Sequence, residues 1–329
     1  MTTGSRFTRF GTTRLRLLAI LGAVALASAL TVAGVGLAND TARTDGTDTS
    51  ATEPTIGIRT FDVPMGITVT PDVAYGTGPE GTPLRLDVCS TAPAGSAPRP
   101  AVVSVHGGSW TRGDKSSDDW RQVCEWLASE GFVAYSVDYG LTPEAPFPAA
   151  IDDLHSAVEW IRAPENADRF GIDADRIGAF GGSAGGNLAA LLGTRGNGPL
   201  TEGSRVAAVA ELSGPSDLRG PSMTTDGVSQ RLQNLVLRYL DCETMSDCPQ
   251  AAGASPVATV DSSDPPFFIV NSVKEFVPLT QATRFASALE KAGVRHELVT
   301  VPGGVHSIGL LDADMRARVA AFLHSTLGT

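Results

Sequence analysis

The chain has 329 residues, and its 36 acidic side chains outnumber its 25 lysines and arginines, which gives a formal charge of −11 at neutral pH. This length fits an α/β domain of about 250 residues with additional segments, and a 42% hydrophobic content is enough for a large core. A strongly acidic chain lacks the basic surface that binding to a phosphate backbone requires, so the composition excludes nucleic acid as a partner.

The first 38 residues are predicted to be a signal peptide or an N-terminal membrane anchor. Four arginines lie between residues 6 and 16, and an uncharged apolar run of 22 residues follows at 17–38. Small residues spaced as Gly36-x-Ala38 or Ala25-x-Ala27 offer cleavage sites, and the run is also long enough to span a bilayer uncleaved. Both alternatives place the remainder outside the cytoplasm, either secreted or anchored to the outer face of the cytoplasmic membrane. A membrane is therefore expected as a partner only through this segment.

Residues 39–60 are predicted to be a flexible linker, because Thr, Asp, Ala and Gly dominate most of this stretch. The folded domain is predicted over 61–329. It opens with alternating apolar and polar residues at 67–69 and 84–88, a pattern typical of antiparallel strands. Strands and helices then alternate. Strands are expected at 101–105, 132–137, 177–180, 206–212, 267–270 and 297–301, and helices at 119–129, 149–161, 184–192, 280–292 and 312–323.

This alternation predicts an α/β fold in which a mostly parallel central sheet has helices on both faces. Residues 213–255 interrupt it, with one helix near 230–239, and are interpreted as a small lid inserted above the sheet. Ligands of such folds bind at the carboxyl ends of the strands. Three segments of chemical interest, around residues 106, 183 and 306, each follow the end of a predicted strand.

All four cysteines, Cys89, Cys124, Cys242 and Cys248, lie in the part predicted to be exported. An even number of cysteines in an exported chain indicates disulfides. Of the three possible pairings we favour Cys242 with Cys248, which closes a short loop, and Cys89 with Cys124. Free buried thiols are the alternative. A metal site is disfavoured because no histidine lies close to either pair in sequence.

Ser183 is the candidate nucleophile. It stands in Gly181-Gly-Ser-Ala-Gly185, a G-x-S-x-G pattern with an apolar strand before it and a helical pattern after it. Glycines are needed there because the turn is strained and passes close to neighbouring backbone. The alternative, a plain glycine-rich turn, is disfavoured because the flanking strand and helix are the setting that this motif requires.

A serine hydroxyl needs a neighbouring base, and His306 is the predicted base because it lies in a loop after the last strand, consistent with the chain order serine, acid, histidine of this motif. The other four histidines lie in predicted helices, at a strand start or in a glycine-rich loop. Glu275 is the favoured acid, since it follows the strand before the final strand and helix. Asp217 remains the alternative, and Asp264 precedes its strand and is disfavoured.

Hydrolysis of an ester also requires amides that stabilise an oxyanion. Gly107, Gly108 and Ser109, in the loop after the strand at 101–105, are predicted to supply them together with Ala184, the residue that follows the nucleophile. Trp110, Phe276 and lid residues near Met223 are candidates for the acyl pocket, with burial in the core as the alternative.

These motifs together resemble the α/β-hydrolase-fold esterases, and more narrowly the hormone-sensitive-lipase-like group and the bacterial feruloyl or acetylxylan esterase-like branch. The resemblance covers about residues 67–326. The segments that carry it are His106-Gly-Gly-Ser-Trp110, Gly113-Asp-Lys115, Phe147-Pro-Ala-Ala-Ile-Asp-Asp153, Gly171-Ile-Asp-Ala-Asp-Arg-Ile177 and Gly181-Gly-Ser-Ala-Gly-Gly186. It implies a triad of serine, acid and histidine, an oxyanion hole in the His-Gly-Gly loop, and no cofactor or metal. Ser109 departs from the family in replacing a frequent third glycine, and Glu275 in lying where relatives often have aspartate.

The leading hypothesis is an exported serine carboxylesterase that acts through an acyl-enzyme on small to medium acyl esters. Its substrate is either a small molecule or an acetyl or aromatic acyl ester linked to a glycan. An amidase of the arylformamidase type and a non-catalytic binding protein with the hydrolase fold are the alternatives. A long-chain lipase is disfavoured because the predicted lid is short and charged.

Overall fold

The computed structural model describes residues 57–328 apart from 79–80, 92–96 and 226. The predicted signal or anchor at 1–38 and most of the predicted linker lie outside the described residues. The end of that linker needs correction. Ile58–Thr60 forms a 3-10 helix, η1, and the Ile58 side chain is only 2% exposed in the core. The folded part therefore begins by residue 58, because an apolar side chain at this position is buried.

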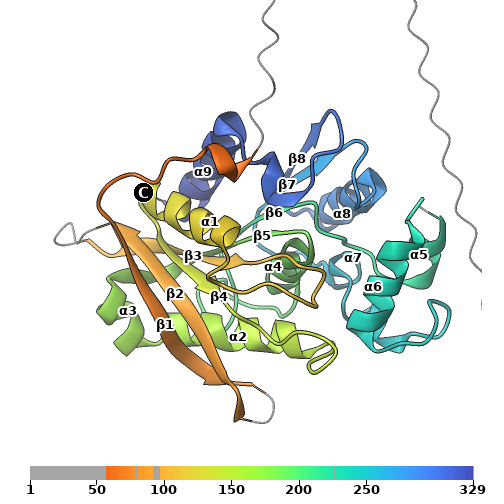
Figure 1. The fold of residues 1–329 in the computed structure, drawn as a ribbon, viewed down its shortest axis with the longest axis horizontal. Coiled ribbons are helices and arrows are strands. Elements are labelled where there is room, and N and C mark those ends of the chain that lie inside the picture. Colours follow the sequence, from red (N-terminus) through yellow and green to blue (C-terminus); the bar gives the residue numbers. More distant parts are fainter. Residues whose placement is uncertain (1–56, 79–80, 92–96, 226, 329) are drawn as a thin grey trace, which may run out of the picture. The chain divides into compact units, whose positions relative to one another are not determined.

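The described residues form an eight-stranded sheet in the order β1-β2-β4-β3-β5-β6-β7-β8 (Figure 1). The two pairings β1–β2 and β2–β4 are antiparallel and the remaining pairings are parallel, which confirms the predicted mostly parallel sheet. The strands are β1 (Ile67–Thr77), β2 (Pro83–Thr91), β3 (Arg99–Val105), β4 (Val133–Val137), β5 (Ile172–Gly182), β6 (Ala208–Leu212), β7 (Phe267–Ser272) and β8 (His296–Val301).

Helices cover both faces of the sheet (Figure 1). One core cluster joins the sheet to α1 (Asp118–Ser129) and α9 (Ala313–Leu327), and the other joins it to α2 (Ala149–Arg162), α3 (Pro164–Phe170), α4 (Ala184–Thr194) and α8 (Leu279–Ala292). Successive residues of β3 alternate between the clusters: Val102 belongs to the first, and Val103 belongs to the second. This alternation is the period-two pattern of a strand that is buried on both faces.

Local sequence signals fix several helix ends. Ser229 caps α6 (Gln230–Leu240) and Asp312 caps α9, because their side chains accept hydrogen bonds from the first-turn amides of Leu232 and Met315. Gly293 ends α8 in the left-handed conformation, with φ of 76°, which glycine adopts without steric cost. Among the described residues no helix is both long enough and apolar enough to span a membrane.

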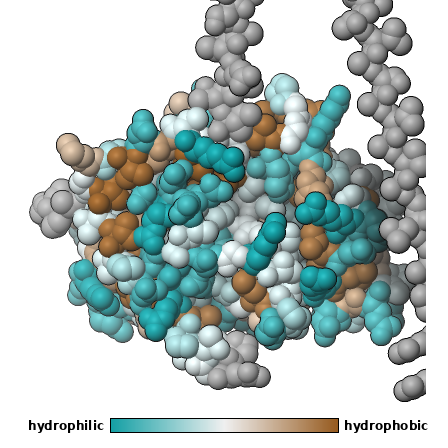
Figure 2. Space-filling model, in the orientation of Figure 1, coloured by the Kyte–Doolittle hydropathy of each residue, from teal (hydrophilic) through white to brown (hydrophobic). Residues whose placement is uncertain are grey.

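The residues predicted as a lid contain α5 (Gly220–Thr225), α6 (Gln230–Leu240) and the 3-10 helix η3 (Pro249–Ala251), drawn in teal at one side of Figure 1. α7 (Pro256–Thr259) follows them. The sequence pattern missed α3, α5 and α7, since helices of four to seven residues show too few turns to reveal a period. On the face visible in Figure 2, hydrophobic side chains lie in separate groups among hydrophilic ones.

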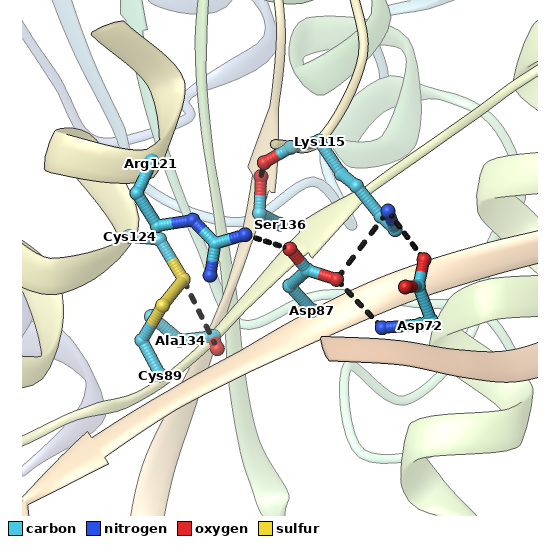
Figure 3. The surroundings of a disulfide bond; sticks show 8 residues. All are labelled: Asp72, Asp87, Cys89, Lys115, Arg121, Cys124, Ala134 and Ser136. Carbon is cyan, nitrogen blue, oxygen red and sulfur yellow. Dashed lines mark hydrogen bonds and ion pairs between the residues drawn. A yellow bond between two sulfur atoms is a disulfide. The ribbon is translucent and has the colours of Figure 1, made fainter. Parts of the chain in front are cut away.

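Both favoured disulfides are present, Cys89–Cys124 and Cys242–Cys248, and the described residues include no free cysteine. Figure 3 shows the first, which joins β2 to α1. Beside it, Arg121 of α1 forms an ion pair with the buried carboxylate of Asp87 of β2. Two neighbouring links, one covalent and one ionic, therefore hold α1 against β2.

Lys115 also contacts Asp87, and with Asp72, Asp87 and Arg121 it forms a charged cluster beside the disulfide (Figure 3). Its ammonium nitrogen lies 2.9 Å from Asp72 and 3.4 Å from Asp87, and its backbone amide donates to the Asp138 carboxylate at 2.7 Å. Lys115 lies in the loop that begins at His106 and leads to α1. This cluster thus anchors that loop to the antiparallel edge of the sheet.

Candidate active site

The candidate nucleophile sits in a sharp turn between β5 and α4. Ser183 has a φ of 58°, in the left-handed region that non-glycine residues rarely occupy, and its amide donates to the Leu212 carbonyl at 2.8 Å. A Cβ atom on Gly181 would lie 2.1 Å from the Gly185 carbonyl oxygen, and one on Gly185 would lie 2.1 Å from the Val105 carbonyl oxygen. Only glycine fits at both positions, which is why the strained turn has this sequence.

The structure brings together the three residues predicted as a triad. His306 Nε2 lies 2.9 Å from Ser183 Oγ, and His306 Nδ1 is hydrogen-bonded to Glu275 Oε2. Because an ionised carboxylate can only accept, Nδ1 carries the proton and donates it to Glu275. Nε2 is then free to accept the Ser183 hydroxyl proton. This geometry suits removal of a proton from Ser183, with the imidazole oriented by a fully buried carboxylate.

Glu275 is held by a residue that the sequence analysis missed. Ser213 Oγ donates to Glu275 Oε1 at 2.9 Å and accepts from the Ser307 amide at 2.9 Å, so it links the acid loop to the residue after His306. The Ser272 amide also donates to Glu275 Oε1, at 2.7 Å. Ser213 directly follows β6, at the carboxyl edge where the other site residues lie, and that position was the available signal.

Asp217, the alternative acid, is engaged elsewhere. Its carboxylate accepts from Arg219 at 2.7 and 2.9 Å and from Arg284 at 3.2 Å. Burial opposes its ionisation, yet the hydrogen bonds and positive charge of these arginines hold the pKa of the Asp217 carboxyl below its usual range. Asp264 is buried near Arg205 at 3.6 Å. The geometry therefore favours Glu275 as the partner of His306.

The predicted oxyanion loop lies against the nucleophile. A Cβ atom on Gly107 would lie 2.9 Å from the Gly182 carbonyl oxygen and 3.4 Å from Ser183 Cβ. Within the part of the chain that the structure describes, the backbone amides of Gly107, Gly108 and Ser109 donate to no backbone acceptor. Ala184, the first residue of α4, has no carbonyl one turn earlier to accept its own amide proton. Unpaired amides beside a nucleophile are suited to bind an oxyanion.

His106 holds this loop in place. Its ring stacks on Tyr139 with 4.3 Å between centroids, its Nδ1 lies 2.7 Å from the Gly107 carbonyl oxygen, and the Tyr139 hydroxyl donates to its carbonyl at 2.7 Å. Burial lowers the pKa of the His106 imidazole to about 4. The ring is therefore neutral at physiological pH and serves the packing of the loop.

A cleft of about 680 Å³ opens above these groups, lined by Ser183, His306 and the three oxyanion-loop residues. Phe276 lines it as predicted, whereas Trp110 is 2% exposed and Met223 is fully buried, so both belong to the core. Trp110 stacks on Tyr239 of α6 with 4.4 Å between centroids, which attaches the predicted lid to the oxyanion loop. The charged side chains Arg112, Asp118, Asp119 and Arg231 also line the cleft.

The described part of the chain brings no three His, Cys, Asp or Glu side chains into an arrangement that could hold a metal ion. The chemistry that this arrangement supports is transfer of an acyl group to Ser183. For that transfer the site supplies a base, an orienting carboxylate and unpaired amides from its own residues.

Comparison with known proteins identifies a family model and several relatives that are similar to this chain. The BD-FAE family model matches residues 86–289. Esterase LipC of Mycobacterium tuberculosis (strain ATCC 25618 / H37Rv) is 33% identical over 251 residues, or 73% of this chain and 60% of LipC. Esterase LipQ of the same organism is 31% identical over 265 residues, or 77% of this chain and 60% of LipQ. The chain thus spans about 60% of the length of these two curated relatives.

Solved structures are similar over most of the domain. Propionate-bound Est2, a thermophilic esterase from Thermogutta terrifontis, is 26% identical with a TM-score of 0.61, over 80% of this chain and 95% of that one. The acetyl ester-xyloside bifunctional hydrolase from Caldicellulosiruptor lactoaceticus is 25% identical with a TM-score of 0.63, over 81% of this chain and 98% of that one.

Proposed function

We propose that this chain, which belongs to the BD-FAE family and has the α/β-hydrolase fold, is a serine carboxylesterase that cleaves small to medium acyl esters through an acyl-enzyme. The observation that carries the proposal is the chain of contacts from Glu275 through His306 to Ser183, beside amides that have no backbone acceptor. The esterases among its relatives support the same reaction class.

In the proposed reaction, His306 Nε2 takes the Ser183 proton as Oγ forms a bond to the ester carbonyl carbon. The carbonyl oxygen becomes an oxyanion that accepts from the amides of Gly107, Gly108 and Ala184, and Ser109 extends this set. His306 then gives its proton to the leaving alkoxide, and the acyl group stays on Ser183. Water, deprotonated by His306, then attacks the acyl carbonyl carbon. The bond from this carbon to Ser183 Oγ breaks, and His306 returns its proton to Oγ as the acid is released.

For the substrate we propose an acetyl or aromatic acyl ester of a small molecule or a glycan. Four charged side chains line the cleft, a surface that disfavours long apolar chains because their burial would desolvate these groups. The relative from Caldicellulosiruptor lactoaceticus, described as an acetyl ester-xyloside hydrolase, supports an acetylated sugar.

The test is hydrolysis of p-nitrophenyl esters from acetate to palmitate by the protein and by Ser183→Ala. Activity is expected on short chains, and the variant should lose up to about 10⁶-fold in kcat if the three residues act as a unit. Ser325→Ala, an exposed serine on α9, is the matched control and should keep the parental rate. Equal rates in Ser183→Ala and the parent would reject the mechanism. Faster cleavage of a formyl anilide than of phenyl acetate would instead indicate an amidase.

We further propose that the protein is exported. The arginines and the apolar run at 1–38 support this, as do two disulfides, which persist mainly in oxidising compartments. Cell fractionation with sequencing of the mature N-terminus distinguishes secretion from anchoring. Recovery from the cytoplasm with four reduced cysteines would refute export.

A further inference from the structure

A second hollow, of about 420 Å³, adjoins the cleft on the side of His306. It lies between η1, the start of α1 and the 3-10 helix η4 (Ser307–Leu310). Asp119, His306 and Ile308 line both the cleft and the hollow, whereas Gly57, Ile58 and Arg59 line the hollow and not the cleft. The two spaces therefore meet at Asp119, His306 and Ile308.

Packing fixes the walls of this hollow. Ile58 is 2% exposed, and a Cβ atom on Gly57, whose φ is 83°, would lie 3.1 Å from the Gly309 carbonyl oxygen. The Arg316 guanidinium lies 5.3 Å from the centre of the Phe61 ring, which follows η1. These contacts hold the backbone of η1 close to η4, so Arg59 starts from a fixed point beside the hollow.

Two opposite charges in the wall are unpaired. Arg59 and Asp119 are exposed and line the hollow, and within the described ranges neither side chain has a hydrogen-bond or ion-pair partner. An apolar ligand would leave both groups desolvated and unpaired, at a cost in free energy. Hydroxyl groups would satisfy both, because they can donate to the carboxylate of Asp119 and accept from the guanidinium of Arg59.

The order of the reaction assigns this hollow to one half of the ester. The acyl carbonyl must face Ser183 and the oxyanion amides, and the leaving oxygen must lie beside His306 Nε2, which protonates it. The hollow is lined by His306 but by neither Ser183 nor an oxyanion-loop residue. It therefore lies on the side from which the alcohol leaves.

We propose that this hollow is the subsite for the alcohol half of the ester, and that Arg59 and Asp119 select an alcohol with several hydroxyl groups, such as a sugar. The proposal rests on the esterase activity proposed above. It predicts that specificity for the alcohol depends on Arg59 of η1 and Asp119 of α1.

The test compares two acetates that share the acyl group: a monoacetylated methyl xyloside and cyclohexyl acetate. Arg59→Ala and Asp119→Ala should each lower kcat/KM for the sugar acetate about 10- to 100-fold, chiefly by raising KM, because each loses hydrogen bonds to a charged group. Both variants should lose much less kcat/KM on cyclohexyl acetate than on the sugar acetate, since the only oxygen of cyclohexanol is esterified and leaves no hydroxyl for either charged group to bind.

Asp62→Ala is the matched control, because Asp62 is an exposed carboxylate near η1 that does not line the hollow. Asp119→Asn should keep part of the sugar preference, since an amide oxygen still accepts. Unchanged ratios of the two acetates in the variants, or equal losses on both, would overturn the subsite while leaving the esterase intact. Absence of all ester hydrolysis in the parent would instead reject the proposed function, and the subsite with it.

Discussion

The two disulfides should contribute unequally to stability, because they close loops of different length. Cys89 and Cys124 are separated by 35 residues, and Cys242 and Cys248 by 6. In the chain-entropy treatment, a cross-link stabilises the fold because it lowers the conformational entropy of the unfolded chain. The stabilisation is about 3.8 kcal/mol for the longer loop and about 2.2 kcal/mol for the shorter one. The double variant Cys89→Ala/Cys124→Ala is therefore expected to be less stable than Cys242→Ala/Cys248→Ala.

These two free energies correspond to decreases in the melting temperature, Tm. With roughly 270 folded residues and about 2.1 cal/mol/K of unfolding entropy per residue, Tm should fall by about 7 °C when Cys89–Cys124 is removed and by about 4 °C when Cys242–Cys248 is removed. Scanning calorimetry under non-reducing conditions measures both. Activity should survive the first change, since the ion pair of Arg121 with Asp87 still attaches α1 to β2.

A reductant provides the control. Cys89 and Cys124 are fully buried, whereas Cys242 and Cys248 are partly exposed, so mild reduction of the native protein should open Cys242–Cys248 first. The Tm after that reduction should match that of Cys242→Ala/Cys248→Ala. The loop-length reasoning would be refuted if removing Cys242–Cys248 lowered Tm as much as removing Cys89–Cys124.

Glu275→Gln should lower kcat by about 10⁴-fold, because an amide no longer orients the imidazole as a carboxylate does. Asp217→Asn should keep kcat within severalfold and lower Tm, because it breaks a buried ion pair. If ester hydrolysis were lost in Asp217→Asn and kept in Glu275→Gln, Asp217 would be the acid. Ser213→Ala should lower kcat about 10- to 100-fold at unchanged KM, since Glu275 Oε1 loses a hydrogen bond, and steady-state kinetics that show a change in KM alone would contradict this role. Burial raises the pKa of the Glu211 carboxyl to about 8 from 4.5, so between these values the folded protein binds the extra proton and stability falls as pH rises. Glu211→Gln removes this titration, and its Tm relative to the parent should rise between pH 5 and pH 8.5; a difference independent of pH would argue against the shift.

Local sequence patterns were sufficient to predict much of the fold. The strand before Ser183, the glycines of its turn and the helix after it are determined by neighbours in sequence, because strand and helix periods and glycine geometry are local properties. The same holds for the parallel sheet, since strands alternating with helices allow few other topologies. Short helices such as α3 and α5 were not predicted, because tertiary packing rather than a periodic sequence stabilises a helix of one or two turns.

The sequence by itself determined the fold class, the chain order of serine, acid and histidine, and the residues able to serve in each role. It left open which of two carboxylates meets His306, and whether Trp110 lines the cleft. Only the tertiary structure decided these points, because the contacts that carry them join residues far apart: 31 positions separate Glu275 from His306, and 94 separate Ser213 from Ser307. Arg59 could not be placed beside the site for the same reason. Thr, Asp, Ala and Gly dominate the predicted linker, so its composition gave no sign that Ile58 is a core residue; the burial of Ile58 brings this segment to the catalytic edge of the sheet.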